Sequence, residues 1–226
     1  MPDFHQIANK LFQSWYELLQ YYNINQNCAE KPFSQIVEAY SNSNRYYHNL
    51  EHIQHVLEVI QTLESRTKCF DIKTVEFAAW FHDIVYDTKA KDNEEKSAEY
   101  AVELLSSLSI PSNVIKNVKS LILKTKTHQI STSDLDAQVL LDADLAILGS
   151  NPDVYSKYAQ AIRQEYIWVP EAEYFSARKR VLEHFLQRDN IYFTQLMQQT
   201  KEKTARNNLN AEIEKFLNYN PVLLEN

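Results

Sequence analysis

A histidine followed directly by an aspartate lies in the middle of the chain, where His82-Asp83 comes immediately after the apolar run 77–81. Imidazole and carboxylate groups are both common ligands of divalent metal ions. Burying two such groups without partners would cost several kcal/mol, because each would lose its hydrogen bonds to water. We therefore expect the two side chains either to bind a cation, with further ligands from elsewhere in the chain, or to pair with each other.

Further candidate ligands are polar residues that lie among apolar neighbours. His52 shares a helical face with Val56, which is expected to face the core. Asp142 and Asp144 both lie in the very apolar stretch 140–148, and each is a candidate. Adjacent residues of a helix point about 100° apart, so a histidine-aspartate pair can hold one cation only with ligands from neighbouring helices. The sequence therefore predicts a metal site assembled from several helices.

The order of these residues resembles a known signature. His52, then His82-Asp83, then Asp144 is similar to the H...HD...D pattern of the HD-domain metal-dependent phosphohydrolases, an all-helical superfamily. The resemblance extends from about Arg45 to Gly149. The whole chain also resembles a bacterial family of predicted HD-type phosphohydrolases.

A shorter segment sharpens the resemblance. The run from Tyr47 to His52 is similar to the YHNxxH segment of cyclic nucleotide phosphodiesterases, in which the second histidine binds metal and the first protonates the leaving group. The chain is shorter than the catalytic domain of those enzymes, and no counterpart of their purine-binding glutamine is identified. Their substrate is therefore not carried over.

The resemblance implies a metal site in which Asp144 is favoured over Asp142. The implied ligands are His52, His82, Asp83 and Asp144. One or two divalent ions are expected, from among Mn, Mg, Fe, Co and Zn, and Asp83 would bridge them if two are bound. Such a site would activate water for attack on a phosphoester, with His48 and Asp83 as catalytic residues and His48 as the proton donor.

Three basic residues are candidates for binding the phosphate of a substrate. Arg45 immediately precedes the segment 47–52, and Lys124 lies near the end of a predicted helix. His128 follows that helix, where some relatives add a histidine to a second metal or to the substrate. The expected substrate is a small phosphorylated metabolite, with a nucleotide as the first candidate. Both a phosphomonoester and a phosphodiester are compatible with this chemistry.

Two alternatives compete with a phosphohydrolase. Some HD-type proteins are di-iron oxygenases with additional histidines, and His128 at most matches one of these. A non-catalytic module that binds or senses a nucleotide would also keep the ligands. Iron-dependent oxygen consumption would favour the first alternative, and tight ligand binding without turnover would favour the second.

The composition indicates which elements position these residues. The chain of 226 residues contains one glycine and six prolines, which excludes glycine-rich phosphate loops and disfavours a many-turned β architecture. Apolar residues instead recur at three- and four-residue steps, as in amphipathic helices. The sequence predicts an all-α, HD-domain-like bundle of about ten helices that forms a single domain over residues 1–226.

The expected helices follow from apolar spacing and from residues typical of helix ends. Pro32 is expected at the first position of a short helix and Asp71 at the cap of the helix that carries His82-Asp83. Ser133 and Asp136 predict a capping box, and Gly149 is expected at the C′ position. The metal-site core is predicted over about 45–149, with flanking helices in 1–40 and 151–219, and the helix ranges are 3–22, 32–40, 47–64, 71–83, 92–108, 111–127, 133–149, 152–168, 170–188, 191–199 and 204–219.

Charge and cysteine content limit the partners and the compartment. The net charge of −7 disfavours stable binding to nucleic acid, whose phosphates attract Lys and Arg. Cys28 and Cys69 are too few and too isolated for a disulfide framework. No long apolar segment or secretory leader is recognised. We therefore expect a cytoplasmic protein that does not associate with membranes.

Overall fold

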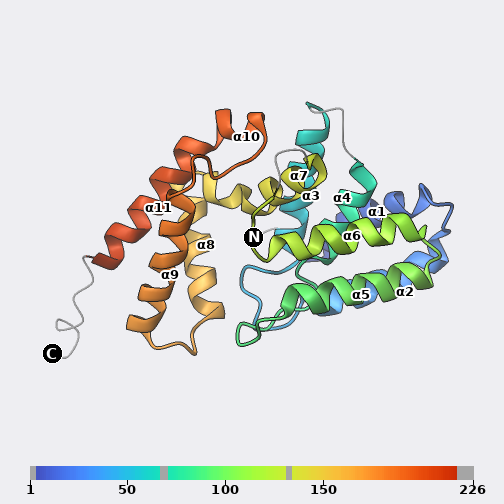
Figure 1. Ribbon diagram of the computed structural model, residues 1–226. Coiled ribbons are helices and arrows are strands. Elements are labelled where there is room, and N and C mark those ends of the chain that lie inside the picture. The colour runs from blue at the N-terminus through green and yellow to red at the C-terminus, as the bar shows by residue number, and fades with distance from the viewer. Residues whose placement is uncertain (1–3, 67–70, 131–133, 218–226) are drawn as a thin grey trace. The chain divides into compact units, whose positions relative to one another are not determined.

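The computed structural model describes residues 4–66, 71–130 and 134–217, and these residues form helices without any strand (Figure 1). This confirms the predicted all-α class. In chain order the elements are α1 (Phe4–Gln20), α2 (Gln26–Tyr40), α3 (Leu50–Glu64), α4 (Ile72–Phe81), α5 (Asn93–Ser107), α6 (Ser112–Thr125), α7 (Leu135–Asp144), the 3-10 helix η1 (Leu145–Gly149), α8 (Pro152–Glu165), α9 (Glu171–Leu186), α10 (Gln195–Thr200) and α11 (Glu202–Leu217).

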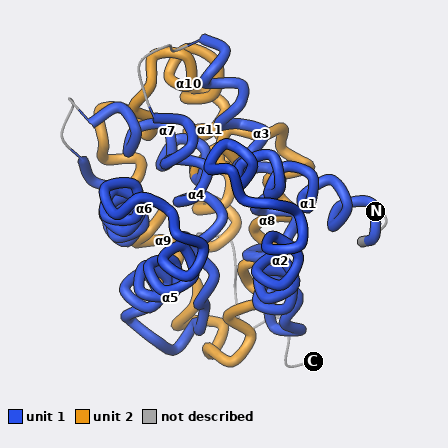
Figure 2. Tube along the Cα trace, turned by 90° about the vertical axis from the view of Figure 1, so that its right-hand side faces the viewer, with its two compact units in different colours: residues 1–144 blue, residues 145–226 orange. Residues whose placement is uncertain are grey.

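The chain divides into two compact units, which Figure 2 shows in different colours. The first unit, Met1–Asp144, contains α1 to α7, and the second unit, Leu145–Asn226, contains η1 and α8 to α11. All the residues predicted for the metal site lie in the first unit. That the whole chain folds as a single domain stays a prediction.

An aromatic cluster joins α1 to α4 in the core of the first unit. The ring of Trp15 meets the rings of Phe77, Trp80 and Phe81 edge-on, with centroids between 5.6 and 6.0 Å apart. All four side chains are fully buried, and losing such a ring typically costs about 3–5 kcal/mol. Helix α4 also packs against α3 and α7, as Figure 1 shows. The end of α4 is therefore held from several sides.

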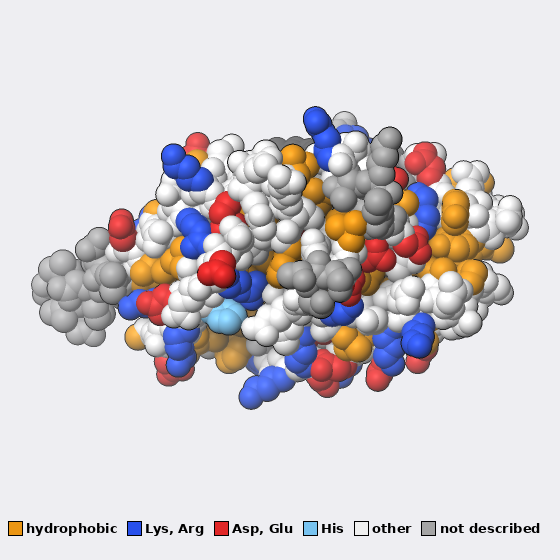
Figure 3. Space-filling model, turned by 45° about the horizontal axis from the view of Figure 1, so that its top comes forward, with side chains coloured by type: hydrophobic (Ala, Val, Ile, Leu, Met, Phe, Trp, Pro, Cys, Tyr) orange, Lys and Arg blue, Asp and Glu red, His pale blue; other side chains and the backbone are white. Residues whose placement is uncertain are grey.

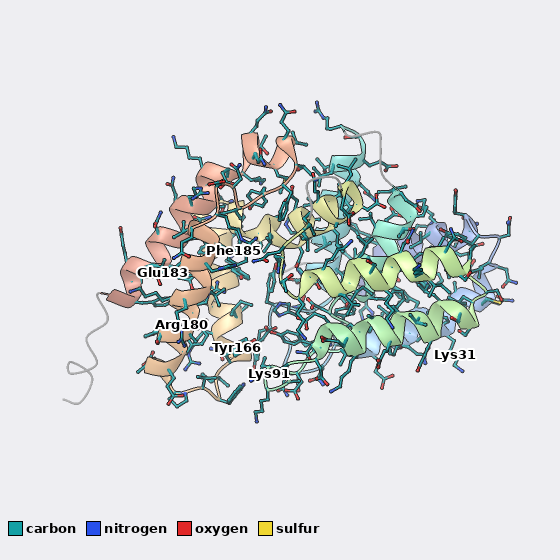
Figure 4. All side chains as sticks on the ribbon, viewed as in Figure 1. Lys31, Lys91, Tyr166, Arg180, Glu183 and Phe185 are labelled. Carbon is teal, nitrogen blue, oxygen red and sulfur yellow. The ribbon has the colours of Figure 1, made fainter. Side chains whose placement is uncertain are left out.

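In the second unit, α8, α9 and α11 surround a buried ion pair. Arg178 Nε of α9 donates to Glu212 Oε1 of α11 at 2.9 Å, and the hydroxyl of Tyr155 from α8 donates to the other carboxylate oxygen at 2.5 Å. Both charges therefore have hydrogen-bonded partners, which their burial requires. Figure 4 shows the side chains of these helices, with Tyr166 after α8 and Arg180 on α9 labelled.

The structure corrects the predicted start of the second helix. α2 begins at Gln26, where the side chain of Asn25 accepts a hydrogen bond from Cys28 N at 3.1 Å. Pro32 lies inside this helix, so its expected place at the first position was wrong. An internal proline removes one backbone hydrogen bond and costs about 3 kcal/mol. Pro32 is buried, and its packing offsets part of that cost.

The helix that carries His52 also begins later than predicted. α3 starts at Leu50, because Asn49 is its N-cap. His48 therefore precedes the helix. The predicted start at residue 47 would have placed His48 on the same helix as His52, one turn before it.

The His82-Asp83 pair lies at a helix end and not within the helix. Asp71 caps the start of α4, as predicted, by accepting a hydrogen bond from Thr74 N at 3.3 Å. The helix ends at Phe81, His82 is its C-cap, and Asp83 lies beyond it. Because Asp83 lies beyond the helix, its side chain is not held at the step of about 100° that separates consecutive helical residues.

Gly149 has a different role from the one predicted. α7 ends at Asp144 and η1 continues to Gly149. The helical segment therefore ends at Gly149, but Gly149 is the last residue of η1 and its φ is not positive, so its predicted place at the C′ position was wrong. A Cβ on Gly149 would lie 2.7 Å from Lys201 Cβ and 2.8 Å from the hydroxyl of Tyr192, and close packing therefore requires glycine here. The predicted capping residue Ser133 lies outside the described residues.

The surface is mixed in charge on the face that Figure 3 shows, with acidic and basic side chains interspersed. No helix in the described part of the chain has the length and apolar character needed to cross a membrane.

Candidate metal centre

The first turn of α3 positions His52. The side-chain oxygen of Asn49 accepts hydrogen bonds from Glu51 N at 2.9 Å and His52 N at 3.4 Å, which fixes the start of the helix. Ile53 and Val56 are fully buried on the same helix. His52 is itself only 2% exposed, so its imidazole lies in the interior of the first unit.

Side chains satisfy the last carbonyl groups of α4 and so position His82. The final carbonyls of a helix have no partner within the helix. His82 Nδ1 lies 2.9 Å from Ala79 O, and the hydroxyl of Tyr40 donates to Trp80 O at 3.0 Å. Because a carbonyl can only accept, Nδ1 must carry the proton of this bond. The lone pair of a neutral His82 is then at Nε2, which faces the site.

Arg45 joins the segment before α3 to the turn after α4. One terminal nitrogen donates to His48 O at 3.0 Å and to Asp83 O at 2.7 Å, and the other donates to Ile84 O at 2.8 Å. The guanidinium carbon also lies 4.9 Å from the ring centroid of Tyr40, a favourable cation–π distance. These contacts position backbone, and a role for Arg45 in binding substrate stays a prediction.

Four side chains from three parts of the first unit converge. Nε2 of His52 and Nε2 of His82 are 3.1 Å apart. Asp83 Oδ2 lies 3.2 Å from Nε2 of His82 and 3.7 Å from Nε2 of His52. Asp144 Oδ1 lies 3.5 Å from each of these nitrogens. His52, His82 and Asp83 form a cluster whose ligand atoms all lie within 4.8 Å of one another and that could hold a metal ion.

These separations fit ligands that share one ion. Nitrogen and oxygen ligands lie about 2.1 Å from a divalent ion such as Zn²⁺ or Mg²⁺. Two such ligands are therefore about 3.0 Å apart at right angles and about 3.4 Å apart at the tetrahedral angle. The separations from 3.1 to 3.7 Å are close to both values. The donor types and their spacing thus suit a divalent cation.

The electrostatics of the site favour positive charge. Burial opposes protonation of His82, but the carboxylates of Asp83 and Asp144 raise its pKa well above the ordinary value. Burial would raise the pKa of Asp144, yet hydrogen bonds from the surrounding histidines hold it well below the ordinary value. The pKa of Asp83 is likewise lowered, chiefly by His82 against the effect of burial. Burial dominates at His52 and lowers its pKa.

The site is closed on the histidine side and open on the carboxylate side. The side chains of His52 and His82 are 0% and 1% exposed, whereas those of Asp83 and Asp144 are 18% and 15% exposed. A cation or a substrate can therefore approach from the side of the carboxylates.

His52 departs in one respect from typical metal-binding histidines. Its Nδ1 is buried without a hydrogen-bond partner among the described residues, whereas the second ring nitrogen of a metal-binding histidine usually has one.

His48 stands at the open edge. Its Nε2 lies 3.9 Å from Asp83 Oδ2, and its side chain is 18% exposed. Its ring packs on Tyr86 with centroids 4.3 Å apart. The structure thus brings His48 beside the convergent groups, although it does not belong to α3.

His128 reaches the site from the turn after α6. Its Nε2 lies 2.9 Å from Asp144 Oδ2, on the carboxylate oxygen that does not face the two buried histidines. The backbone of His128 is left-handed, with a φ of 49°, which costs a non-glycine residue about 1–2 kcal/mol. Strained residues of this kind cluster at functional sites.

The remaining candidates are placed differently. The ammonium of Lys124 pairs with the carboxylate of Asp134, so its predicted contact with substrate stays a prediction. Asp142 is fully buried, whereas Asp144 is the aspartate whose carboxylate lies beside the histidines. The geometry therefore favours Asp144 over Asp142 as the last ligand.

Three residues that shape the site were missed in the sequence. Tyr40 and Asn49 hold the ends of α4 and α3, as described above. Ser97 Oγ accepts from Val85 N at 3.1 Å and donates to Val85 O at 3.2 Å, which ties the turn after Asp83 to α5. Only Asn49 carried a recognisable signal, since asparagine directly before an apolar-periodic run is typical of an N-cap.

A scan against protein-family models found a match to the stretch that contains the four converging side chains. Residues 49–160 match the HD domain. The match supports membership of the HD-domain superfamily. No curated protein and no solved structure matches the chain.

The HD domain implies a metal-dependent phosphohydrolase family, and the histidine-rich cluster is consistent with that class. The matched stretch begins at Asn49, so Arg45 and His48 precede it. It contains His128 as well as the candidate ligands.

Proposed function

We propose that the protein is a metal-dependent phosphohydrolase that cleaves a phosphoester of a small metabolite, with a nucleotide as the first candidate. The observation that carries the proposal is the convergence of two imidazoles and two carboxylates at separations suited to one ion. The HD-domain match supports the same class of enzyme.

The roles of the residues follow from their positions. His52 and His82 would hold a divalent ion from the buried side, and Asp83 and Asp144 from the open side. When bound, the ion supplies the charge that activates water and offsets negative charge on the phosphoryl oxygens. His48, at the open edge, would donate a proton to the leaving oxygen.

The choice of a nucleotide rests on the segment from Tyr47 to His52, which is similar to that of cyclic nucleotide phosphodiesterases. For the whole chain we infer kinship with the bacterial family of predicted HD-type phosphohydrolases. The limited exposure of the site, 15% and 18% at the two aspartates, suits a small substrate better than nucleic acid.

The test is a substrate panel with metal analysis. The purified protein is assayed for phosphate release from nucleotides and sugar phosphates, and for cleavage of a generic phosphodiester, with Mn²⁺, Co²⁺ or Mg²⁺ supplied. Turnover is expected with at least one substrate, and the monoester and diester arms assign the type of bond. His82→Ala is expected to abolish both activity and bound metal.

The matched control is His184→Ala, because His184 is an exposed histidine of the second unit and its loss should leave activity and metal content unchanged. Failure of every substrate with every metal would overturn the proposal. Tight nucleotide binding without turnover would instead identify a sensing module.

A di-iron oxygenase is the second candidate, because His128 adds a histidine to the edge of the site at 2.9 Å from Asp144. Protein loaded with Fe²⁺ should then consume oxygen, and His128→Ala should abolish this consumption. Phosphate release without oxygen uptake would exclude it.

A further inference from the structure

The second unit contains a cavity that the proposed reaction does not use. It has a volume of about 290 Å³ and lies between α8, α9 and α11. Four aromatic side chains line it, Tyr155, Tyr174, Phe175 and Phe216. The rings of Phe175 and Phe216 stack with centroids 4.7 Å apart and an interplanar angle of 21°. A mostly apolar surface that includes aromatic rings, with some polar side chains among them, is typical of pockets for small molecules.

One polar group in this lining lacks a partner. Tyr174 is only 6% exposed, and its hydroxyl has no hydrogen-bond partner among the described residues. Buried hydroxyl groups are rarely left unpaired, because the loss of their bonds to water is costly. Burial raises the pKa of Tyr174 to about 12, so the hydroxyl keeps its proton and can donate. A ligand oxygen in the cavity would satisfy it.

The charges at the cavity favour an anion. Glu212 is the acidic residue of the lining, and its carboxylate is already paired with Arg178 and Tyr155. Arg163 and Lys215 also line the cavity, and neither forms an ion pair within the described part of the chain. The guanidinium of Arg163 donates to the carbonyls of Tyr166 at 2.6 Å and Val169 at 3.2 Å, and its positive charge has no carboxylate partner there. The guanidinium carbon of Arg163 lies 4.7 Å from the ring centroid of Tyr174. Arg163 therefore lies beside the tyrosine with the unpaired hydroxyl, and Lys215 lines the same cavity.

We propose that this cavity binds a small aromatic carboxylate. The aromatic ring packs against Phe175 and Phe216, and a carboxylate oxygen accepts the hydrogen bond of Tyr174. The charges of Arg163 and Lys215 select the anion over a neutral analogue. The site lies wholly within the second unit and requires none of the candidate metal ligands.

The experiment measures the binding of benzoate and phenylacetate to the full-length protein by calorimetry and by ligand-observed NMR. Benzyl alcohol is the neutral comparison compound, and inorganic phosphate is the anion without a ring. Both carboxylates are expected to bind more tightly than either comparison compound. Metal-depleted protein and His82→Ala are expected to bind them equally well, which separates this site from the proposed hydrolase.

Three variants locate the site. Tyr174→Phe is expected to weaken benzoate binding about tenfold, because it removes a hydrogen bond to a charged group, without lowering the melting temperature. Ala159→Phe fills the cavity and should abolish binding. Lys215→Gln should weaken benzoate severalfold and leave benzyl alcohol unchanged. The matched control is Tyr21→Phe, which alters a tyrosine that is 66% exposed in the first unit.

Several outcomes would overturn the proposal. These are the absence of binding by either carboxylate, equal affinity for benzyl alcohol, binding of phosphate as tight as that of benzoate, and binding that survives both Tyr174→Phe and Ala159→Phe. Should Ala159→Phe fail to fold, Tyr174→Phe and Lys215→Gln carry the test, because their substitutions remove a hydroxyl and a charge without adding volume.

Discussion

Arg45 acts on the candidate site through the backbone. Its guanidinium bonds to the carbonyl of His48 on one side and to the carbonyls of Asp83 and Ile84 on the other. A planar fork with several donors can hold three carbonyl groups at fixed angles, whereas the single ammonium of lysine cannot. The residue thus fixes the relative position of the candidate proton donor and a candidate ligand.

Arg45→Ala is therefore expected to lower kcat about tenfold or more, a loss of about 1.4 kcal/mol in the transition state, and Arg45→Lys should restore little of it. Steady-state kinetics and metal content measure the effect, with the exposed Arg180→Ala as control. A direct phosphate contact would instead raise KM at unchanged kcat, and lysine would then rescue binding. That pattern would favour the substrate-binding role predicted from the sequence.

His128 combines a side-chain contact with backbone strain. His128→Asn and His128→Ala both remove the imidazole that reaches Asp144, but asparagine tolerates left-handed backbone better than alanine. Both variants should lose most phosphohydrolase activity, and the asparagine variant should be more stable than the alanine variant by about 1 kcal/mol. Urea unfolding and kinetic assays check the two effects separately. Full activity in either variant would remove His128 from the site.

At the scale of elements, the cap of α3 couples helix stability to the position of His52. Asn49→Ala should destabilise the protein by about 1 kcal/mol and weaken metal binding, because the first turn of α3 carries the ligand. Urea unfolding and metal titration measure the two effects. The matched control is Asn25→Ala, which removes the equivalent cap of α2 and should cost similar stability without changing metal affinity. Equal metal affinity in both variants would contradict the coupling.

Helix existence was predictable from the sequence, and helix ends were less so. Apolar spacing identified every long helix, and Asp71 was recognised as a cap. Pro32 was misplaced because its packing in the core outweighs its local preference for a first turn. His82-Asp83 was placed inside a helix because nothing local stops one after residue 81. Hydrogen bonds from Tyr40 and Arg45, which lie far away in the sequence, satisfy backbone carbonyls at and just after the end of α4. Patterns in a single sequence do not reveal such long-range contacts.

The convergence of the site was more predictable than its geometry. His52, His82-Asp83 and Asp144 stood out because each is a polar group in an apolar run, and the structure brings all of them together. The approach of His128 to Asp144 depends on a left-handed turn, which its sequence does not indicate. The functional roles of these residues stay predictions.

At the scale of the whole molecule, bound metal should stabilise one unit in particular. The ligands lie in α3, after α4 and at the end of α7, all within the first unit. An ion at about a hundredfold excess over its Kd should add about 2.7 kcal/mol to the free energy of unfolding. Hydrogen exchange with and without a chelator should show slower exchange in α3, α4 and α7 on metal addition. Equal protection in α8, α9 and α11 would contradict a site confined to the first unit.

The unequal exposure of the site also has a kinetic consequence. The buried imidazoles form its floor and the two aspartates form its rim, so an ion can leave past the carboxylates while the helices stay packed. Exchange of one ion for another should therefore be faster than global unfolding, and its rate should be insensitive to low concentrations of urea. A metal would then occupy the protein according to its supply in solution, not according to which ion was present when the chain folded.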